Sequence, residues 1–189
     1  GRVIIDRQKR RGLAALKRGQ YRDVAIVHAP GIGNRDKTDL AIQRAIVRHC
    51  ERERYRFAVL DSAPGLTSLS DERLHPKRAI DSGYAAVYYP WYDTRHPHTG
   101  TKILVPPGGA VCGIYASTDR DRGVWKAPAG VVVNGALDLE VDVETRMQEV
   151  LNPRGVNCIR RFAGRGIRIW GSRTLASDPE WKYVPIRRL

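Results

Sequence analysis

The hydrophobic and polar positions near the N-terminus predict a strand, a helix and a second strand. Residues 23–28 (DVAIVH) and 56–61 (RFAVLD) are apolar runs with the length of buried strands. Between them, apolar residues recur at helical spacing over residues 40–47, with Thr38 or Asp39 as the candidate helix cap. This order is that of a βαβ unit, so we expect two parallel strands joined by a right-handed crossover.

The middle of the chain predicts two further strands and a second helix. Residues 84–90 (YAAVYYP) are apolar on both faces, which favours a strand at the centre of a sheet. The polar residues 93–100 (DTRHPHTG) predict a turn, and residues 101–105 (TKILV) predict a strand that ends at Pro106-Pro107. We expect a helix with small residues along it to begin there, because proline is tolerated in a first turn.

Shorter elements are predicted in the C-terminal third. Asn134-Gly135 is a hairpin or loop signal, and the apolar alternation over residues 137–143 predicts a strand after it. Residues 144–151 have a helical pattern, which ends at Asn152-Pro153 because the residue before a proline disfavours helix.

Two last strands and two helical segments complete the expected fold. Residues 156–162 (VNCIRRF) and 167–171 (IRIWG) predict an antiparallel pair around the turn AGRG, and residues 12–18 and 76–82 predict short helices. These patterns together predict an α/β fold: a mixed sheet with βαβ units, flanked by helices. We expect a single core domain over residues 1–189.

The composition is that of a globular protein. Hydrophobic residues make up 42% of the chain and charged residues 28%, which does not fit a disordered protein. No apolar run approaches the roughly 20 residues that a membrane-spanning helix needs. The first ten residues, GRVIIDRQKR, do not fit a signal peptide. Because they lack Met and begin within a pattern, we expect the chain to be a piece of a longer protein.

The charge adds an expectation about partners. Lys and Arg number 33 against 20 acidic residues, a formal net charge of +13. A charge of this size favours an acidic partner, such as nucleic acid, a membrane surface or an acidic protein. The alternative is a solvated basic face that only promotes solubility. The arginines are spread along the chain, which argues against a simple nucleic-acid-binding arm.

The cysteines indicate neither a disulfide framework nor a metal site. Cys50, Cys112 and Cys158 are odd in number and far apart, and no C-x-x-C motif is present. We predict reduced, buried thiols, which favour folding in a reducing compartment.

Candidate binding motifs are weak. Residues 31–38 (GIGNRDKT) follow a predicted strand and precede a helix, as phosphate loops do, but they match neither the dinucleotide nor the triphosphate pattern. A plain turn is the expected interpretation, with an anion at the helix N-terminus as the alternative. His96 and His98 have a spacing that can hold a metal, but no further ligand lies nearby, so a solvent-facing loop is expected.

The catalytic candidates are equally weak. Asp61 and Asp81 fall near strand or turn boundaries, where a hydrolase places paired acids but where many sheets also place capping residues. No serine lies in a G-x-S-x-G motif. We therefore predict no catalytic residue, no metal site and no cofactor.

The four tryptophans lie in or beside segments with proline or glycine and have basic or polar neighbours. They fit plugs at the edge of a core, or anchors in a contact surface, because Trp and Arg dominate interface energies. They are Trp91, Trp125, Trp170 and Trp181.

Several long blocks together resemble the tail sheath proteins of contractile phages and of related contractile injection systems. The blocks are residues 84–91 (YAAVYYPW), 105–130 (VPPGGAVCGIYASTDRDRGVWKAPAG), 151–175 (LNPRGVNCIRRFAGRGIRIWGSRTL) and 178–189 (DPEWKYVPIRRL). Residues 11–31 (RGLAALKRGQYRDVAIVHAPG) are similar to the opening of the same domain. The resemblance covers nearly the whole chain and implies the central domain, without the terminal arms and C-terminal helices of the family.

This resemblance implies a structural protein and not an enzyme. Many copies would stack as a helical sleeve around an inner tail tube, then contract and drive the tube through a target envelope. The implied partners are other copies of the chain, the inner tube protein, and baseplate and tail terminator proteins, with no small-molecule substrate and no membrane insertion. Assembly is expected in bacterial or archaeal cytoplasm, as part of a virion tail or injection particle.

The charge pattern gives candidate contact residues for that role. We expect Arg120, Arg122, Trp125, Lys126, Arg160, Arg161, Arg165 and Arg168 to contact other subunits or the tube. A basic α/β nucleic-acid-binding module is the first alternative, and a hydrolase or nucleotide enzyme that uses Asp61 and Asp81 is the second.

Overall fold

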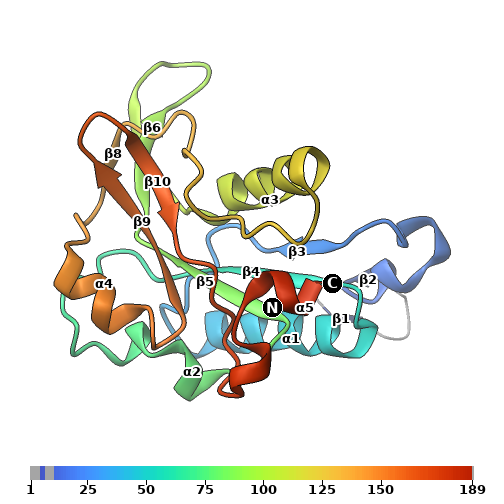
Figure 1. Cartoon of the computed structure of the whole chain (residues 1–189). Helices are drawn as coiled ribbons and strands as arrows, with labels where there is room; N and C mark the ends of the chain where they lie inside the picture. The colour runs from blue at the N-terminus through green and yellow to red at the C-terminus, as the bar shows by residue number, and fades with distance from the viewer. Residues whose placement is uncertain (1–4, 7–10, 189) are drawn as a thin grey trace.

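The computed structural model describes residues 5–6 and 11–188 and contains a five-stranded mixed sheet at its centre (Figure 1). Its strand order is β10-β9-β5-β4-β3. The strands are β3 (Ile26–His28), β4 (Phe57–Asp61), β5 (Ala85–Tyr89), β9 (Val156–Phe162) and β10 (Gly166–Trp170). β3, β4, β5 and β9 run parallel, and β10 returns antiparallel to β9. The predicted mixed α/β sheet is therefore confirmed, with β5 at its centre.

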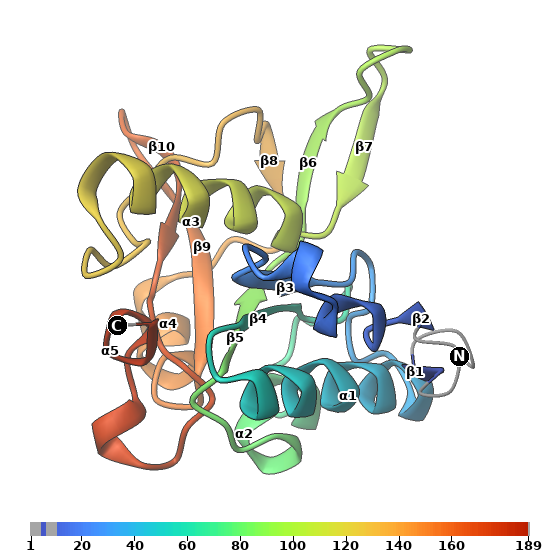
Figure 2. The ribbon, with the colours of Figure 1, turned by 90° about the vertical axis from the view of Figure 1, so that its right-hand side faces the viewer.

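Helices α1 (Lys37–Glu53) and α3 (Gly108–Arg122) cover opposite faces of this sheet (Figure 2). Because successive side chains of a strand point to opposite faces, each strand contributes to both cores. Val59 of β4 packs in the cluster that includes Tyr115 of α3, whereas its neighbour Ala58 packs with Ile46 of α1.

Helix α1 begins two or three residues earlier than the sequence predicts. The Asp36 side chain is the cap, since its carboxylate accepts hydrogen bonds from the N–H groups of Thr38 (2.7 Å) and Asp39 (2.9 Å). Asp39 lies inside the helix and pairs with Arg35 at 2.8 Å. The prediction of Thr38 or Asp39 as the cap is wrong, because an acceptor two or three residues earlier reaches these N–H groups.

A second sheet forms where a turn was predicted. Strands β6 (Tyr92–Arg95), β7 (Lys102–Val105) and β8 (Asp138–Leu139) have the order β7-β6-β8, and the β6–β7 hairpin projects from the body of the protein (Figure 2). The polar residues at the start of 93–100 are thus strand and not turn. β6 is held by strands on both sides, so pairing overrides its polar character.

The predicted strand over residues 137–143 is also largely wrong, because only β8 pairs there. Leu139 and Val143 are buried and Leu137 is exposed. The alternation therefore reflects a loop that inserts two apolar side chains, and it does not reflect a continuous ladder.

The remaining helices and strands are short. Residues 12–18, predicted as helix, contain only the 3-10 helix Ala15–Lys17, with another at Gly19–Tyr21. Other 3-10 helices span Glu72–Leu74 and Pro179–Trp181. The further elements are β1 (Ile5–Asp6), β2 (Arg11–Gly12), α2 (Pro76–Ala79), α4 (Thr145–Leu151) and α5 (Val184–Arg188).

The outer edge of β10 is covered by the segment of residues 130–133. The N–H groups of Gly130 and Val133 donate to the carbonyls of Ile169 (2.8 Å) and Ile167 (2.9 Å), and the Ile169 N–H donates to Val131 (3.0 Å). The last strand of the main sheet therefore has hydrogen-bond partners on both sides.

Arg56 links the N-terminal segment to the main sheet through hydrogen bonds, and its side chain is almost fully buried. Its guanidinium donates to the carbonyls of Val24 (2.9 Å), Leu16 (2.6 Å) and Tyr21 (2.8 Å). A fourth hydrogen bond joins it to His49 Nε2 of α1 at 2.9 Å. Four acceptors thus compensate the buried charge.

The three cysteines are free thiols, as predicted. Cys50 and Cys158 are buried and Cys112 is partly buried. Burial raises the pKa of each thiol to about 12, so none is a reactive thiolate near neutral pH. No helix in the described ranges has the length and apolarity needed to cross a membrane.

Candidate subunit-contact surface

Asp61 has a structural position at the start of α3. Its buried carboxylate accepts hydrogen bonds from the N–H groups of Gly108 (2.7 Å) and Gly31 (3.3 Å), and His28 Nε2 lies 3.6 Å away. Burial raises the pKa of Asp61, against the opposing effects of His28 and the two N–H groups. The carboxylate thus joins the ends of β3 and β4 to α3.

Asp61 and Asp81 do not form a catalytic pair. Parallel pairing sets Ala58 beside Ala85 and Asp61 beside Tyr88, so Asp61 lies at the carboxyl ends of the strands. Asp81 precedes β5, beyond the amino ends, where it accepts a hydrogen bond from the Ser177 N–H at 2.8 Å.

The predicted loop around His96 and His98 is the tip of the β6–β7 hairpin. His96 Nδ1 accepts hydrogen bonds from the backbone N–H groups of His98 and Thr99, each at 3.3 Å. Within residues 5–6 and 11–188, no three His, Cys, Asp or Glu side chains gather as metal ligands.

The candidate contact residues in the last turn of α3 and just after it are scattered, and all of them except the partly buried Lys126 are exposed. Arg120 pairs with its neighbour Asp121 at 2.7 Å, and Arg122 ends the helix in solvent. Trp125 is 68% exposed and lies directly over Gly123, where a Cβ would meet the indole at 2.3 Å. Lys126 donates to the carbonyl of Ala127 at 3.0 Å.

The consecutive Arg160 and Arg161 of β9 point to opposite faces of the sheet. Arg161 pairs with Asp138, and with Asp142 at 3.7 Å. Arg160 donates to the Val143 carbonyl at 2.8 Å, and its guanidinium lies 5.4 Å from the Phe162 ring centroid. Only Arg161 is therefore neutralised by carboxylates.

Arg165 and Arg168, both candidate contact residues, line one hollow of about 430 Å³ together with Phe162, Trp170 and Gly130. The Phe162 and Trp170 rings pack with centroids 4.7 Å apart. Arg168 donates to the carbonyls of Arg165 (2.8 Å) and Gly130 (2.7 Å), which fixes its guanidinium at the rim.

An adjoining hollow of about 520 Å³ shares Gly130 and Trp170 with the first. Its walls include Gln148 of α4, Arg173 and Tyr183. We call the two hollows together the Trp170 groove. Their shared lining residues place Trp170, which is 42% exposed, between them.

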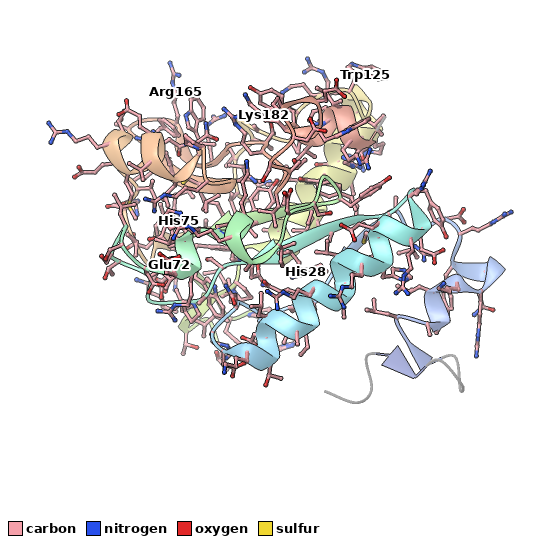
Figure 3. All side chains as sticks on the ribbon, turned by 90° about the horizontal axis from the view of Figure 1, so that it is seen from below. His28, Glu72, His75, Trp125, Arg165 and Lys182 are labelled. Carbon is pink, nitrogen blue, oxygen red and sulfur yellow. The ribbon has the colours of Figure 1, made fainter. Side chains whose placement is uncertain are left out.

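Positive charge around the Trp170 groove lacks acidic partners. Of the described ion pairs, none involves a basic residue that lines or borders the groove. These residues are Arg160, Arg165, Arg168, Arg173 and Lys182. Arg165, Lys182 and Trp125 lie along the side of the protein opposite α1 (Figure 3). The surface therefore suits an acidic partner.

Comparison with known proteins decides the family. The family model of the phage tail sheath protein central domain matches residues 10–175. The chain belongs to the phage tail sheath family. A prophage major tail sheath protein of Pseudomonas aeruginosa (strain UCBPP-PA14) is 27% identical over 185 residues, covering 93% of this chain and 45% of that protein.

Solved sheath structures agree with this assignment. The sheath domain is 34% identical to a chain of the PVC extracellular contractile injection system in its contracted state, with a TM-score of 0.73. That match covers 94% of this chain and 48% of the other. The contracted helical sheath of the anti-feeding prophage is 36% identical, with a TM-score of 0.67, and the match covers 87% of this chain and 42% of the other.

The sheath domain spans less than half the length of these relatives. Its family and fold are those of structural sheath proteins, and its relatives are parts of phage tails or injection particles. These relatives give no support to the nucleic-acid-binding alternative.

Sequence reasoning missed several residues of the groove. Gln148 and Tyr183 carried no signal, because α4 and the segment before α5 reach the groove only through tertiary packing. Arg173 was not among the predicted contact residues. The alternation of arginines and aromatics from Arg160 to Arg173 was the available signal.

Proposed function

We propose that this chain is the central domain of a contractile sheath subunit. Copies polymerise helically around an inner tail tube, and contraction of this sheath drives the tube through a target cell envelope. The observation that carries the proposal is the family match over residues 10–175, supported by the similarity to two sheaths solved in the contracted state.

The proposed mechanism is mechanical. Buried side chains cover both faces of the main sheet, so the domain moves as a solid body. Head-to-tail contacts that do not close into a ring generate a helical filament. Energy is stored in the packing between copies, and contraction exchanges one packing for another of lower energy. No bond-making centre is required of this domain, and we propose no enzymatic activity, cofactor or small-molecule substrate.

The proposed partners follow from this role. They are other copies of the sheath protein, the inner tail tube protein, and the baseplate and tail terminator proteins. Assembly takes place in bacterial or archaeal cytoplasm. A reducing compartment agrees with the three free thiols.

The proposed contact residues divide into two groups. Arg160, Arg165 and Arg168 surround the Trp170 groove and are available to a partner as a set. Arg120, Arg122, Trp125 and Lys126 belong to the end of α3 and the following loop, and Arg161 is already paired. Because exposed ion pairs contribute only about 0–1 kcal/mol each, such contacts can be exchanged during contraction.

Electron microscopy of the full-length protein tests the proposal. We expect hollow sleeves, formed with the inner tube protein or by self-association at high protein concentration. Charge reversal at Arg165, Arg168 and Arg122 together should reduce sleeve formation, whereas reversal of three exposed α1 residues, Lys37, Arg48 and Arg52, is the matched control. A protein that stays monodisperse under all these conditions would contradict the proposed function.

A further inference from the structure

We infer that the Trp170 groove binds an extended acidic polypeptide segment of a neighbouring protein in the assembly. The inference rests on the proposed function only for the source of that segment. It names the chemistry of one contact: carboxylates held by arginines, and a backbone N–H held by Gln148.

The basic side chains around the groove lack carboxylate partners among the residues that the structure describes. Elsewhere in the described structure, many basic side chains have a carboxylate within ion-pair distance, such as Arg78 with Glu72 and Lys102 with Asp93. The five basic residues around the groove have none. A set of like charges without counter-charges destabilises an isolated domain, and an acidic partner relieves that repulsion.

Several cations of the groove are held in place by neighbouring groups of the same chain. The Arg173 guanidinium lies 5.0 Å from the centroid of the Tyr183 ring, and the Lys182 ammonium lies 5.2 Å from it. Arg168 is fixed by two backbone carbonyls. Cations held in this way lose little side-chain entropy when a carboxylate arrives, so more of the interaction free energy contributes to affinity.

A hydrogen-bond acceptor on α4 favours polypeptide as the partner. Gln148 Nε2 donates to the Trp170 carbonyl at 3.0 Å, while Gln148 Oε1 is shielded from solvent and has no partner among the described residues. A buried acceptor favours a ligand that supplies a donor. A polypeptide carries an N–H group at almost every residue, whereas a phosphodiester backbone carries none.

The shape of the groove fits an extended chain. The two hollows, of about 430 and 520 Å³, share Gly130 and Trp170 in their walls, so one extended chain that passes Trp170 can contact both. Trp170, which packs against the Phe162 ring, provides an apolar anchor where the two hollows adjoin. Partly exposed tryptophan flanked by arginine is the residue combination that dominates binding energy in protein interfaces.

The test uses the full-length protein and a fluorescein-labelled hexaglutamate peptide, with fluorescence anisotropy as the readout. Hexaglutamine and a thymidine hexanucleotide serve as the neutral and the nucleic-acid probes. We expect hexaglutamate to bind, and the double variant Arg165→Glu/Arg173→Glu to weaken its binding by about tenfold or more.

Two further variants make the test specific. Arg48→Glu/Arg52→Glu changes the net charge equally on exposed α1 residues, and we expect it to weaken binding by less than about threefold. Gln148→Leu is expected to weaken hexaglutamate binding by about fivefold and to leave hexanucleotide binding unchanged. The unfolding midpoint of each variant shows whether it folds. If a variant with Arg173→Glu does not fold, the single variant Arg165→Glu replaces the double variant.

Three outcomes would overturn the inference: no hexaglutamate binding, equal losses in both charge-reversal pairs, or a groove-dependent preference for the hexanucleotide. The proposed function fails separately. If sleeves form but hexaglutamate does not bind in the groove, only the inference is wrong. If the groove binds hexaglutamate but the protein never forms sleeves, only the sheath function is wrong.

Discussion

At the scale of single residues, Asp61 shows how a buried acid holds two elements together. Its carboxylate accepts hydrogen bonds from the N–H groups of Gly108 and Gly31, so it fixes the first turn of α3 over the ends of β3 and β4. The close approach requires glycine at position 108, because a Cβ there would meet His28 Cε1 at 2.1 Å and Asp61 Oδ1 at 2.7 Å.

Replacing Gly108 by alanine should therefore destabilise the domain. We expect a loss of about 2 kcal/mol in the free energy of unfolding, because the added methyl group forces His28 and Asp61 apart. Urea denaturation measures this. Gly113→Ala in the same helix is the control, because a Cβ at position 113 meets nothing within 4 Å. This substitution should raise the free energy of unfolding by about 0.5–1 kcal/mol. Equal effects at the two glycines would show that the close approach is unimportant.

At the scale of elements, α1 is coupled to the N-terminal segment through Arg56 and His49. Because the Arg56 guanidinium only donates, His49 Nε2 must accept, and the imidazole is held neutral. Burial lowers the pKa of His49, and the positive charge of Arg56 lowers it further. The joint between α1, β4 and residues 16–24 is thus built for a neutral histidine.

This joint predicts acid sensitivity. Since the pKa of His49 is lower in the folded state than its unfolded value of 6.5, the unfolded chain binds the proton more readily. Stability should fall as the pH drops below about 6.5, by at most about 1.4 kcal/mol per pH unit from this group. Urea unfolding of wild type and His49→Gln at about pH 7.5 and about pH 5.5 checks this.

Two variants test whether His49 causes the loss of stability at low pH. His49→Gln keeps an acceptor for Arg56 and should lose less stability on acidification than wild type. His98→Gln at the exposed hairpin tip is the control and should behave like wild type. If His49→Gln loses as much stability as wild type between the two pH values, the histidine is not the acid-sensitive element.

The elements also show what the sequence could predict. β4 and β5 were predictable because burial on both faces makes each a continuous apolar run, and α1 was predictable because its buried face gives its apolar residues a helical period. α3 was predictable from the prolines before it and the small residues along it. β6 was not predictable, because it is a strand through its pairing with β7 and β8 and its own side chains are mostly polar. Of the strand predicted over residues 137–143, only β8 forms. The arginines of the groove were predictable from charge, but their meeting with Gln148 and Tyr183 depends on how α4 and α5 pack.

At the scale of the whole molecule, charge is unevenly compensated. The chain carries +13, and its ion pairs lie largely away from the Trp170 groove. The isolated domain therefore bears repulsion among these cations, which the acidic partner inferred above would reduce.

This imbalance predicts a salt effect. At an ionic strength of about 10 mM, Arg165→Glu/Arg173→Glu should raise the unfolding temperature by about 2 °C, because it reduces repulsion among the groove cations. At about 300 mM the difference should largely vanish, since salt screens exposed charges. Calorimetry at the two salt concentrations checks this. A lower unfolding temperature for the variant at both would show that these arginines stabilise the domain.

The segment of residues 130–133 along β10 has a consequence for crowding. A sleeve holds many identical sheets at very high local concentration, where an unpaired strand edge would recruit the edge of the next copy and fuse with it irreversibly. Because β10 already has a neighbour from its own chain, that edge offers no template for amyloid-like growth. In the proposed sheath, this edge would let copies move past one another during contraction without becoming permanently joined.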